Sequence, residues 1–284
     1  IVIAASVSCN TNKSAQKDLV SGLLIKGNNL TCDNVYLSVN DQKTSKTTFV
    51  YGQKFKMNFD NIQGFKEESG NVFPGMQIFV TGKSGDTLLK SNDLYQMYDN
   101  GLNLSPLLLH ADLTVATPIS SGSDYTMIVK IWDKKGKGTF TGEVDFKVVS
   151  NDNLKVDADG VTFDEIYLYT GDRDEVITDN KIKFNENTSV ILEGLTGFTA
   201  ENEMVFPGMS LSARDNDNNA IFEYDDLFVE YSNSGIPILD FLSGISSSFT
   251  LNKGEFKTPL HFVVKVWDKK GDAGISIEAD LFPE

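Results

Sequence analysis

The chain has 284 residues, of which 40% are hydrophobic and 11% aromatic. This is enough apolar material for packed cores, and the length is typical of two domains. The net charge of -15 argues against a nucleic-acid-binding protein, because an acidic surface repels phosphate. No apolar run approaches the roughly 20 residues that a membrane-spanning helix needs.

The negative charge is concentrated in one half of the chain. Residues 1–154 contain 15 acidic and 15 basic side chains, whereas residues 155–284 contain 25 acidic and 10 basic ones. The acidic half could attract divalent cations or a basic partner. The alternative is that these charges only keep the surface solvated.

The first 19 residues read as the remnant of a truncated export signal followed by a polar lipoprotein tether. Eight small or apolar residues precede Cys9, and the next apolar residue is Leu19, apart from Ala15. The sequence Ser6-Val7-Ser8-Cys9 resembles the lipobox of bacterial lipoproteins, although Ser6 stands where that family usually has Leu. The resemblance implies that Cys9 carries a diacylglycerol, so that a lipid anchor holds the protein to a membrane of the bacterial cell envelope, at the outer membrane.

A disulfide between Cys9 and Cys32 is the alternative for an exported protein with two cysteines. Cys32 aligns with Phe163 in the repeat described next. We therefore expect Cys32 to pack as a small apolar side chain in a core, which leaves Cys9 unpaired.

A repeat spans nearly the whole chain. Four segments recur in the same order, at offsets of 131 to 135 residues. A duplicated domain explains this order, and we place the copies at residues 20–150 and 155–284, with a linker over residues 150–160. The segments begin at Leu30 and Val161, Ile62 and Leu195, Ser91 and Tyr224, and Ile128 and Val263.

Within each copy, short runs alternate between apolar and polar residues, as in Val35, Leu37 and Val39. Turn residues separate these runs every 8–15 residues. This spacing is typical of antiparallel β-sheets packed face to face. The sequence therefore predicts an all-β protein of two tandem homologous antiparallel β-sandwich domains.

The segment "SNDLYQMYDNG" from Ser91 interrupts this pattern. Its polar start and its apolar residues Leu94, Tyr95 and Tyr98 predict a short helical turn. Asn92 or Asp93 would cap that turn.

The sequence Trp-Asp-Lys-Lys-Gly occurs in both copies, at Trp132 and Trp267. It follows an apolar β-branched run and precedes another strand, which predicts a hairpin started by Asp and closed by Gly. We expect its lysines to face solvent and its Trp to pack inside the sandwich.

The second copy contains an acidic loop, "ARDNDNNAIFEYDDLF". Oxygen ligands at alternating positions suit Ca²⁺, and the loop style resembles that of calcium-binding C2 domains. An alternative is an ion-free hairpin tip. In copy one, Gly82, Ser84 and Asp86 take the positions of the alternating residues. The predicted calcium ligands are Asp215, Asp217, Asn219, Asp225 and Asp226.

Motifs of common enzyme classes are missing from the sequence. His110 and His261 do not occupy equivalent places in the two copies, and neither has zinc-type spacing to a cysteine. There is no nucleophile elbow, phosphate loop or dinucleotide fingerprint.

We therefore expect a non-catalytic envelope lipoprotein that binds or assembles with a protein or a glycan. It would require no cofactor, although Ca²⁺ could stabilise the second domain. The competing hypothesis is an envelope glycan hydrolase that uses paired carboxylates.

Overall fold

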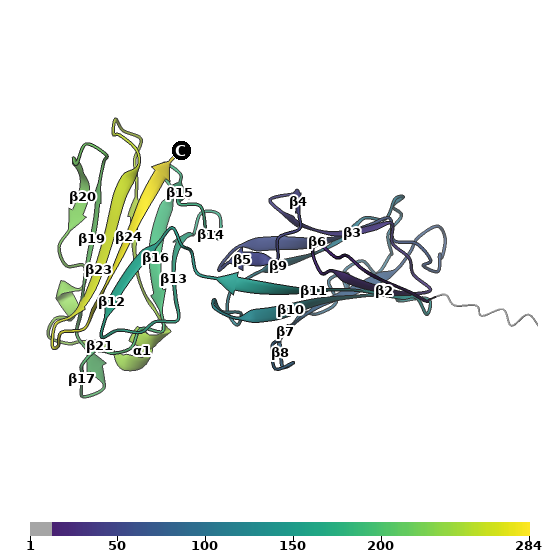
Figure 1. The fold of residues 1–284 in the computed structure, drawn as a ribbon, viewed down its shortest axis with the longest axis horizontal. Coiled ribbons are helices and arrows are strands. Elements are labelled where there is room, and N and C mark those ends of the chain that lie inside the picture. Colours follow the sequence, from purple (N-terminus) through teal and green to yellow (C-terminus); the bar gives the residue numbers. More distant parts are fainter. Residues whose placement is uncertain (1–12) are drawn as a thin grey trace, which may run out of the picture. The chain divides into compact units, whose positions relative to one another are not determined.

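The computed structural model describes residues 13–284, and Cys9 lies outside this part of the chain. The described residues form strands β1 to β24, one 3-10 helix, η1 (Val229–Tyr231), and one short α-helix, α1 (Ile238–Ser243) (Figure 1). The predicted all-β fold is confirmed. No helix in residues 13–284 is both long and apolar enough to cross a membrane.

The chain forms two compact units. Module 1 comprises Lys54–Val148 and the described residues up to Phe49, and module 2 comprises Val50–Gln53 and Val149–Glu284. The segment Lys155–Asp159, part of the predicted linker, is a strand of module 2 that pairs with the last strand of the chain.

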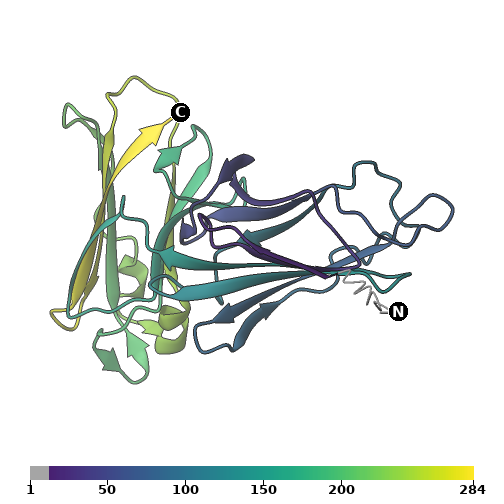
Figure 2. The same ribbon diagram turned by 45° about the vertical axis from the view of Figure 1, so that its right-hand side comes forward.

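Module 1 contains two mainly antiparallel sheets (Figure 2). The larger has the order β1-β2-β11-β10-β7-β8, with β5 also pairing β11, and the smaller has the order β4-β3-β6-β9. The strands are β1 (Lys13–Lys17), β2 (Leu24–Asn28), β3 (Asn34–Val39), β4 (Gln42–Thr44), β5 (Thr48–Val50), β6 (Lys54–Asp60), β7 (Pro74–Gly82), β8 (Thr87–Lys90), β9 (Leu109–Thr114), β10 (Asp124–Asp133) and β11 (Thr139–Val149).

Module 2 repeats this architecture. One sheet has the order β12-β24-β23-β19-β20, with β15 pairing β24, and the other has the order β14-β13-β16-β22. A small third sheet has the order β17-β18-β21. The strands are β12 (Lys155–Asp159), β13 (Glu165–Thr170), β14 (Glu175–Ile177), β15 (Lys181–Ile182), β16 (Asn187–Glu193), β17 (Ala200–Glu201), β18 (Met204–Val205), β19 (Pro207–Arg214), β20 (Ala220–Tyr224), β21 (Ile236–Pro237), β22 (Ile245–Thr250), β23 (Leu260–Asp268) and β24 (Gly274–Pro283).

The cores follow from the alternation along the strands. In β10, every second residue from Tyr125 to Asp133 is buried, while most of the intervening residues are half-buried. Stacked rings add to the module 1 core, where the centroids of Phe49 and Phe55 lie 4.0 Å apart. Burying one such side chain stabilises the fold by about 1.5–3 kcal/mol.

Candidate functional site

The repeated Trp does not enter the sandwich. Trp132 and Trp267 are half-buried on the outward side of their sheets, opposite Gly75 and Gly208 on the neighbouring strand. A Cβ atom on either glycine would lie 2.1 Å from Cε2 of its Trp. The prediction of a core Trp is wrong, because the buried Ile131 takes the inward position and alternation turns the next side chain outward.

The Asp of the motif connects the hairpin to a distant loop. Asp133 is buried, and its Oδ2 accepts the backbone N–H of Lys66 at 2.7 Å. Its Oδ1 accepts the backbone N–H of Lys135 at 2.9 Å. In module 2, Asp268 accepts the equivalent bonds from Thr199 at 2.6 Å and from the residue two positions on at 2.9 Å. The predicted hairpin is confirmed, with Asp as its anchor.

The first lysine of the motif faces the protein, contrary to the prediction that both lysines face solvent. Lys134 Nζ lies 2.7 Å from Asp93 Oδ2 and donates to the carbonyl oxygen of Tyr95 at 2.8 Å. Its side chain is only 26% exposed. The module 2 counterparts are Lys269, Asp226 and Phe228, at 2.7 and 3.1 Å.

The aspartate that meets this lysine also caps a turn, as expected for Asp93. Its Oδ1 accepts the backbone N–H groups of Met76 and Tyr95, both at 3.0 Å. Burial raises the pKa of Asp93, but the hydrogen bonds from Lys134 and from these two N–H groups outweigh burial and leave the pKa below its usual value. Asp226 has the same arrangement and the same direction of pKa shift.

The turn that this pair holds displays aromatic and aliphatic side chains. We call residues 93–101 and 226–235 the aromatic loops. The ring centroids of Tyr95 and Tyr98 lie 5.6 Å apart, and those of Phe228 and Tyr231 lie 6.0 Å apart. Exposed apolar side chains lie in or just after these loops. They include Leu94, Met97 (88% exposed), Leu104 and Leu108 in or after the first loop, and Val229 (67%) and Leu239 (75%) in or after the second.

The sequence of the first aromatic loop predicts a capped turn, and this prediction gives the loop no binding role. The signal was present, because Leu94, Tyr95 and Tyr98 recur as Leu, Phe and Tyr at an offset of 133 residues. Apolar residues repeated outside the alternating strands could have identified an exposed feature common to both modules.

The predicted calcium ligands do not assemble. Asp215 Oδ1 accepts the backbone N–H groups of Asp217 and Asn219 at 3.0 and 2.8 Å, and its Oδ2 accepts the Asn219 side-chain amide at 3.0 Å. These bonds, led by the Asn219 side chain, lower the pKa of Asp215 despite the opposing effect of desolvation. Asp217 Oδ2 lies 2.7 Å from Lys257 Nζ.

The last two predicted ligands lie outside this loop. Asp226 is paired with Lys269, and Asp225 is exposed. Among residues 13–284, no three His, Cys, Asp or Glu side chains form a group that could hold a metal ion.

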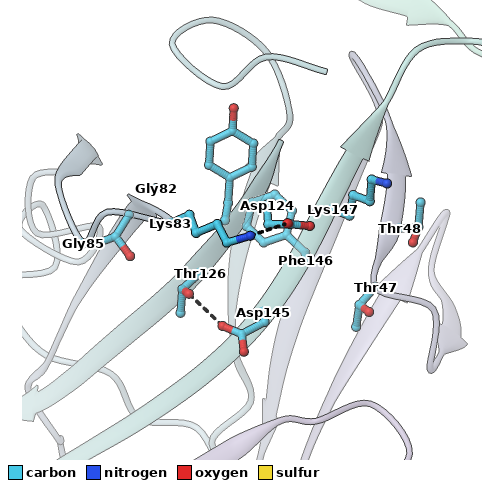
Figure 3. Close-up of a pocket in the computed structure, with 12 residues that line it drawn as sticks. Thr47, Thr48, Gly82, Lys83, Gly85, Asp124, Thr126, Asp145, Phe146 and Lys147 are labelled. Carbon is cyan, nitrogen blue, oxygen red and sulfur yellow. Dashed lines mark hydrogen bonds and ion pairs between the residues drawn. The ribbon is translucent and has the colours of Figure 1, made fainter. Parts of the chain in front are cut away.

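A groove of about 570 Å³ lies at the ends of β7, β10 and β11 in module 1 (Figure 3). Lys83 Nζ is 3.9 Å from Asp124 Oδ2, and the Thr126 hydroxyl donates to Asp145 Oδ1 at 2.7 Å. The two carboxylates in this groove are thus already partnered by a cation or a hydroxyl.

The corresponding end of β23 and β24 in module 2 has a different pair. His261 Nδ1 lies 2.7 Å from Asp280 Oδ1, beside a cavity of about 510 Å³. His261 pairs across the strands with Asp280, as Thr126 does with Asp145. The two modules have therefore diverged at this end of the sandwich.

Cys32 is a half-buried free thiol. Its Sγ donates to the carbonyl oxygens of Asn34 and Asp60, both at 3.1 Å. Burial raises the pKa of Cys32 to about 11, so the thiol is protonated and a poor nucleophile at neutral pH. Cys9, the predicted lipidation site, lies outside the described residues.

The fold and these loops define a protein of two β-sandwich modules with equivalent aromatic loops. No protein-family model and no curated protein matches the sequence significantly. Similar solved structures include the fibronectin(III)-like modules of Clostridium thermocellum CbhA, at 8% identity over 87% of this chain and 94% of that chain, with a TM-score of 0.20.

Two streptococcal domains are also similar. The C-terminal domain of the Streptococcus pyogenes antigen I/II-family protein AspA is 9% identical over 88% of this chain and all (100%) of that chain, with a TM-score of 0.28. The C-terminal domain of the Streptococcus agalactiae AgI/II polypeptide BspA is 10% identical over 87% and 99%, with a TM-score of 0.25. At these identities and TM-scores, the likeness does not indicate a function for this chain.

Proposed function

We propose that this protein is a non-catalytic lipoprotein of the bacterial cell envelope, anchored at the outer membrane through Cys9, whose two modules bind a partner protein. No cofactor is needed for this role. The observation that carries the binding role is the pair of equivalent aromatic loops, each held by a lysine and an aspartate and each displaying exposed apolar side chains.

The fixed base of each loop supports a binding role. The ion pair and the two backbone hydrogen bonds to Asp93 order the loop before any partner arrives. A preordered loop loses less conformational entropy on binding than a mobile one. Exposed aromatic and apolar side chains on a loop held in this way are suited to act as anchors at an interface.

The chemistry of the loops favours a protein partner over a glycan. Met97 and Val229 are largely exposed aliphatic side chains. Aliphatic groups gain affinity when a partner's apolar surface covers them, whereas sugars require stacking rings together with many polar groups. Protein interfaces are also enriched in Tyr and Met, as is the first loop.

The binding role is tested with the full chain and the envelope fraction of its native cells. We expect the double variant Met97→Asp and Val229→Asp to bind this fraction about tenfold more weakly, because each change places a charge in a desolvated contact. Val20→Asp is the matched control, since Val20 is 79% exposed and lies outside both aromatic loops. Equal binding by the double variant and wild type would refute the assignment.

Treatment of the envelope separates the classes of partner. Protease digestion of the fraction should abolish binding, whereas periodate oxidation of its sugars should leave binding unchanged. The opposite result would identify a glycan partner. Release of shortened glycans by the wild-type chain, and its loss when Asp124 and Asp145 are changed to Asn, would instead support the hydrolase.

The anchor is tested by metabolic labelling. The precursor expressed in a bacterium should incorporate labelled fatty acid, and Cys9→Ala should not. Lipidation supplies about 0.8 kcal/mol of membrane affinity per buried CH₂ group. Label that persists in Cys9→Ala, or a Cys9–Cys32 disulfide found by mass spectrometry, would contradict the proposed anchor.

A further inference from the structure

The edge strand β22 lacks the features that usually keep sheet edges apart. Unpaired N–H and C=O groups at an edge recruit other strands unless a charge, Pro or a cover blocks them. Among residues 13–284, the other edge strands of five or more residues, β1, β9, β12 and β20, each contain a charged residue. The sequence of β22, Ile-Ser-Ser-Ser-Phe-Thr, contains neither a charge nor Pro.

The equivalent edge of module 1 is covered. In β9, His110 pairs with Asn58 of β6, and in β22, Ser246 pairs with Ile191 of β16. Because β6 and β16 correspond at an offset of 133 residues, His110 and Ser246 occupy equivalent positions. Burial raises the pKa of Tyr95, while the backbone N–H of His110 acts on its hydroxyl in the opposite direction, so this hydroxyl lies against the edge of β9 as a cap.

Module 2 cannot form this cap. Phe228 stands in the place of Tyr95 and has no hydroxyl. By equivalence with His110, the N–H of Ser246 points away from β16. The alternation of an antiparallel ladder gives the N–H groups of Ser248 and Thr250 the same direction. All three side chains are exposed.

We propose that β22 pairs antiparallel with β22 of a second copy of this chain, which joins two modules into one continuous sheet. In a pair related by a two-fold axis, β22 of one copy lies beside the identical β22 of the other copy. A charged residue in this strand would therefore lie near the same charge in the second copy, and the two would repel. β22 avoids this repulsion and offers hydroxyl side chains that can bond across the pair. Other faces of module 2 are less suitable, because residues 155–284 have 25 acidic and 10 basic residues.

A second feature adjoins this strand. The helix α1 ends at Ser243, two residues before β22 begins, and contacts β22 and β18. Its Leu239 is 75% exposed, the highest exposure of a large apolar residue in module 2. The element next to β22 thus carries a largely exposed apolar side chain.

The test is sedimentation equilibrium of the full chain carrying Cys9→Ala, under reducing conditions, so that neither lipid nor disulfide joins copies. We expect a monomer–dimer equilibrium with a dissociation constant on the order of 0.1 mM, since one strand pair is a small interface. Ser248→Pro removes an outward N–H and should weaken the dimer at least about tenfold. Ser248→Ala is the matched control and should dimerise like the parent.

A second measurement and a second variant keep the test independent of folding defects. Hydrogen exchange at Ser246, Ser248 and Thr250 should slow as protein concentration rises, while exchange in β9 should not change. If Ser248→Pro fails to fold, the double variant Ser246→Lys and Ser248→Lys replaces it, with the same expected loss. A monomer up to about 1 mM, a dimer unaffected by these changes, or protection that appears only with another protein would overturn the proposal.

Discussion

The two modules agree in how they hold their aromatic loops and differ in how they protect their sheet edges. Asp133 and Asp268 anchor equivalent hairpins in the two modules, and each neighbouring lysine meets an aspartate at 2.7 Å. At the edge, by contrast, Tyr95 caps β9 while Phe228 leaves β22 open. The comparison indicates that the shared Asp and Lys residues hold the loops in both modules, whereas the divergent edge residues are available for an interaction that only one module makes.

The largest effect is expected from removing the hairpin anchor. Asp133→Ala and Asp268→Ala should each lower the free energy of unfolding of their own module by about 2–4 kcal/mol, since each leaves two backbone N–H groups unpaired. Each module contains one Trp, so Trp fluorescence during urea unfolding in Trp132→Phe or Trp267→Phe backgrounds reports the modules separately. A large loss in one module and none in the other would show that the anchors are not equivalent.

The next effect concerns acid stability. The pKa values of Asp93 and Asp226 are lowered in the folded state, so each carboxylate stabilises its module above its unfolded pKa of about 3.9. This stabilisation is lost as the pH falls through the folded-state pKa. We expect the melting temperatures of both modules to fall below about pH 4, and Asp93→Asn to flatten this dependence in module 1 alone.

If Asp93→Asn left the pH dependence of the melting temperature unchanged, groups other than Asp93 would cause the acid sensitivity of module 1. The variant Asp99→Asn is the matched control. Asp99 is an exposed carboxylate of the same loop with no direct contact to Lys134 among the ion pairs of the described residues, so its removal should leave the acid dependence unchanged.

A smaller effect should follow from exchanging the edge residues. Tyr95→Phe removes the cap on His110 and should destabilise module 1 by about 0.5–1.5 kcal/mol, with faster amide exchange at His110. Phe228→Tyr should slow exchange at Ser246 and weaken self-association of the chain. Unchanged exchange at both amides would mean that the two loops do not control the edges.

The smallest effect is expected from calcium. Because Asp215 is already bonded within its own loop and Asp217 is paired with Lys257, millimolar Ca²⁺ should leave the melting of both modules nearly unchanged in calorimetry. A rise confined to module 2, reversed by chelator and absent in Asp215→Ala plus Asp217→Ala, would instead establish the calcium site.

The sequence alone was sufficient for the all-β class, the duplication and the position of the hairpins. These features depend on neighbouring residues, namely alternation with a period of two, the Asp and Gly of the turns, and segments repeated in a constant order. Such patterns can be recognised in the sequence without knowing which strands pair with one another. The turn capped by Asp93 was predictable for the same reason.

The tertiary structure decided which face and which partner each side chain has. Trp132 lies outside the core because the register places it over Gly75, and Asp226 meets Lys269, 43 positions along the chain, rather than the calcium loop. Strand register and long-range ion pairs depend on the packing of the whole module, and no local pattern specifies them. For the same reason, only the pairing of β9 and β22 with their neighbours revealed that one edge is capped and the other is open.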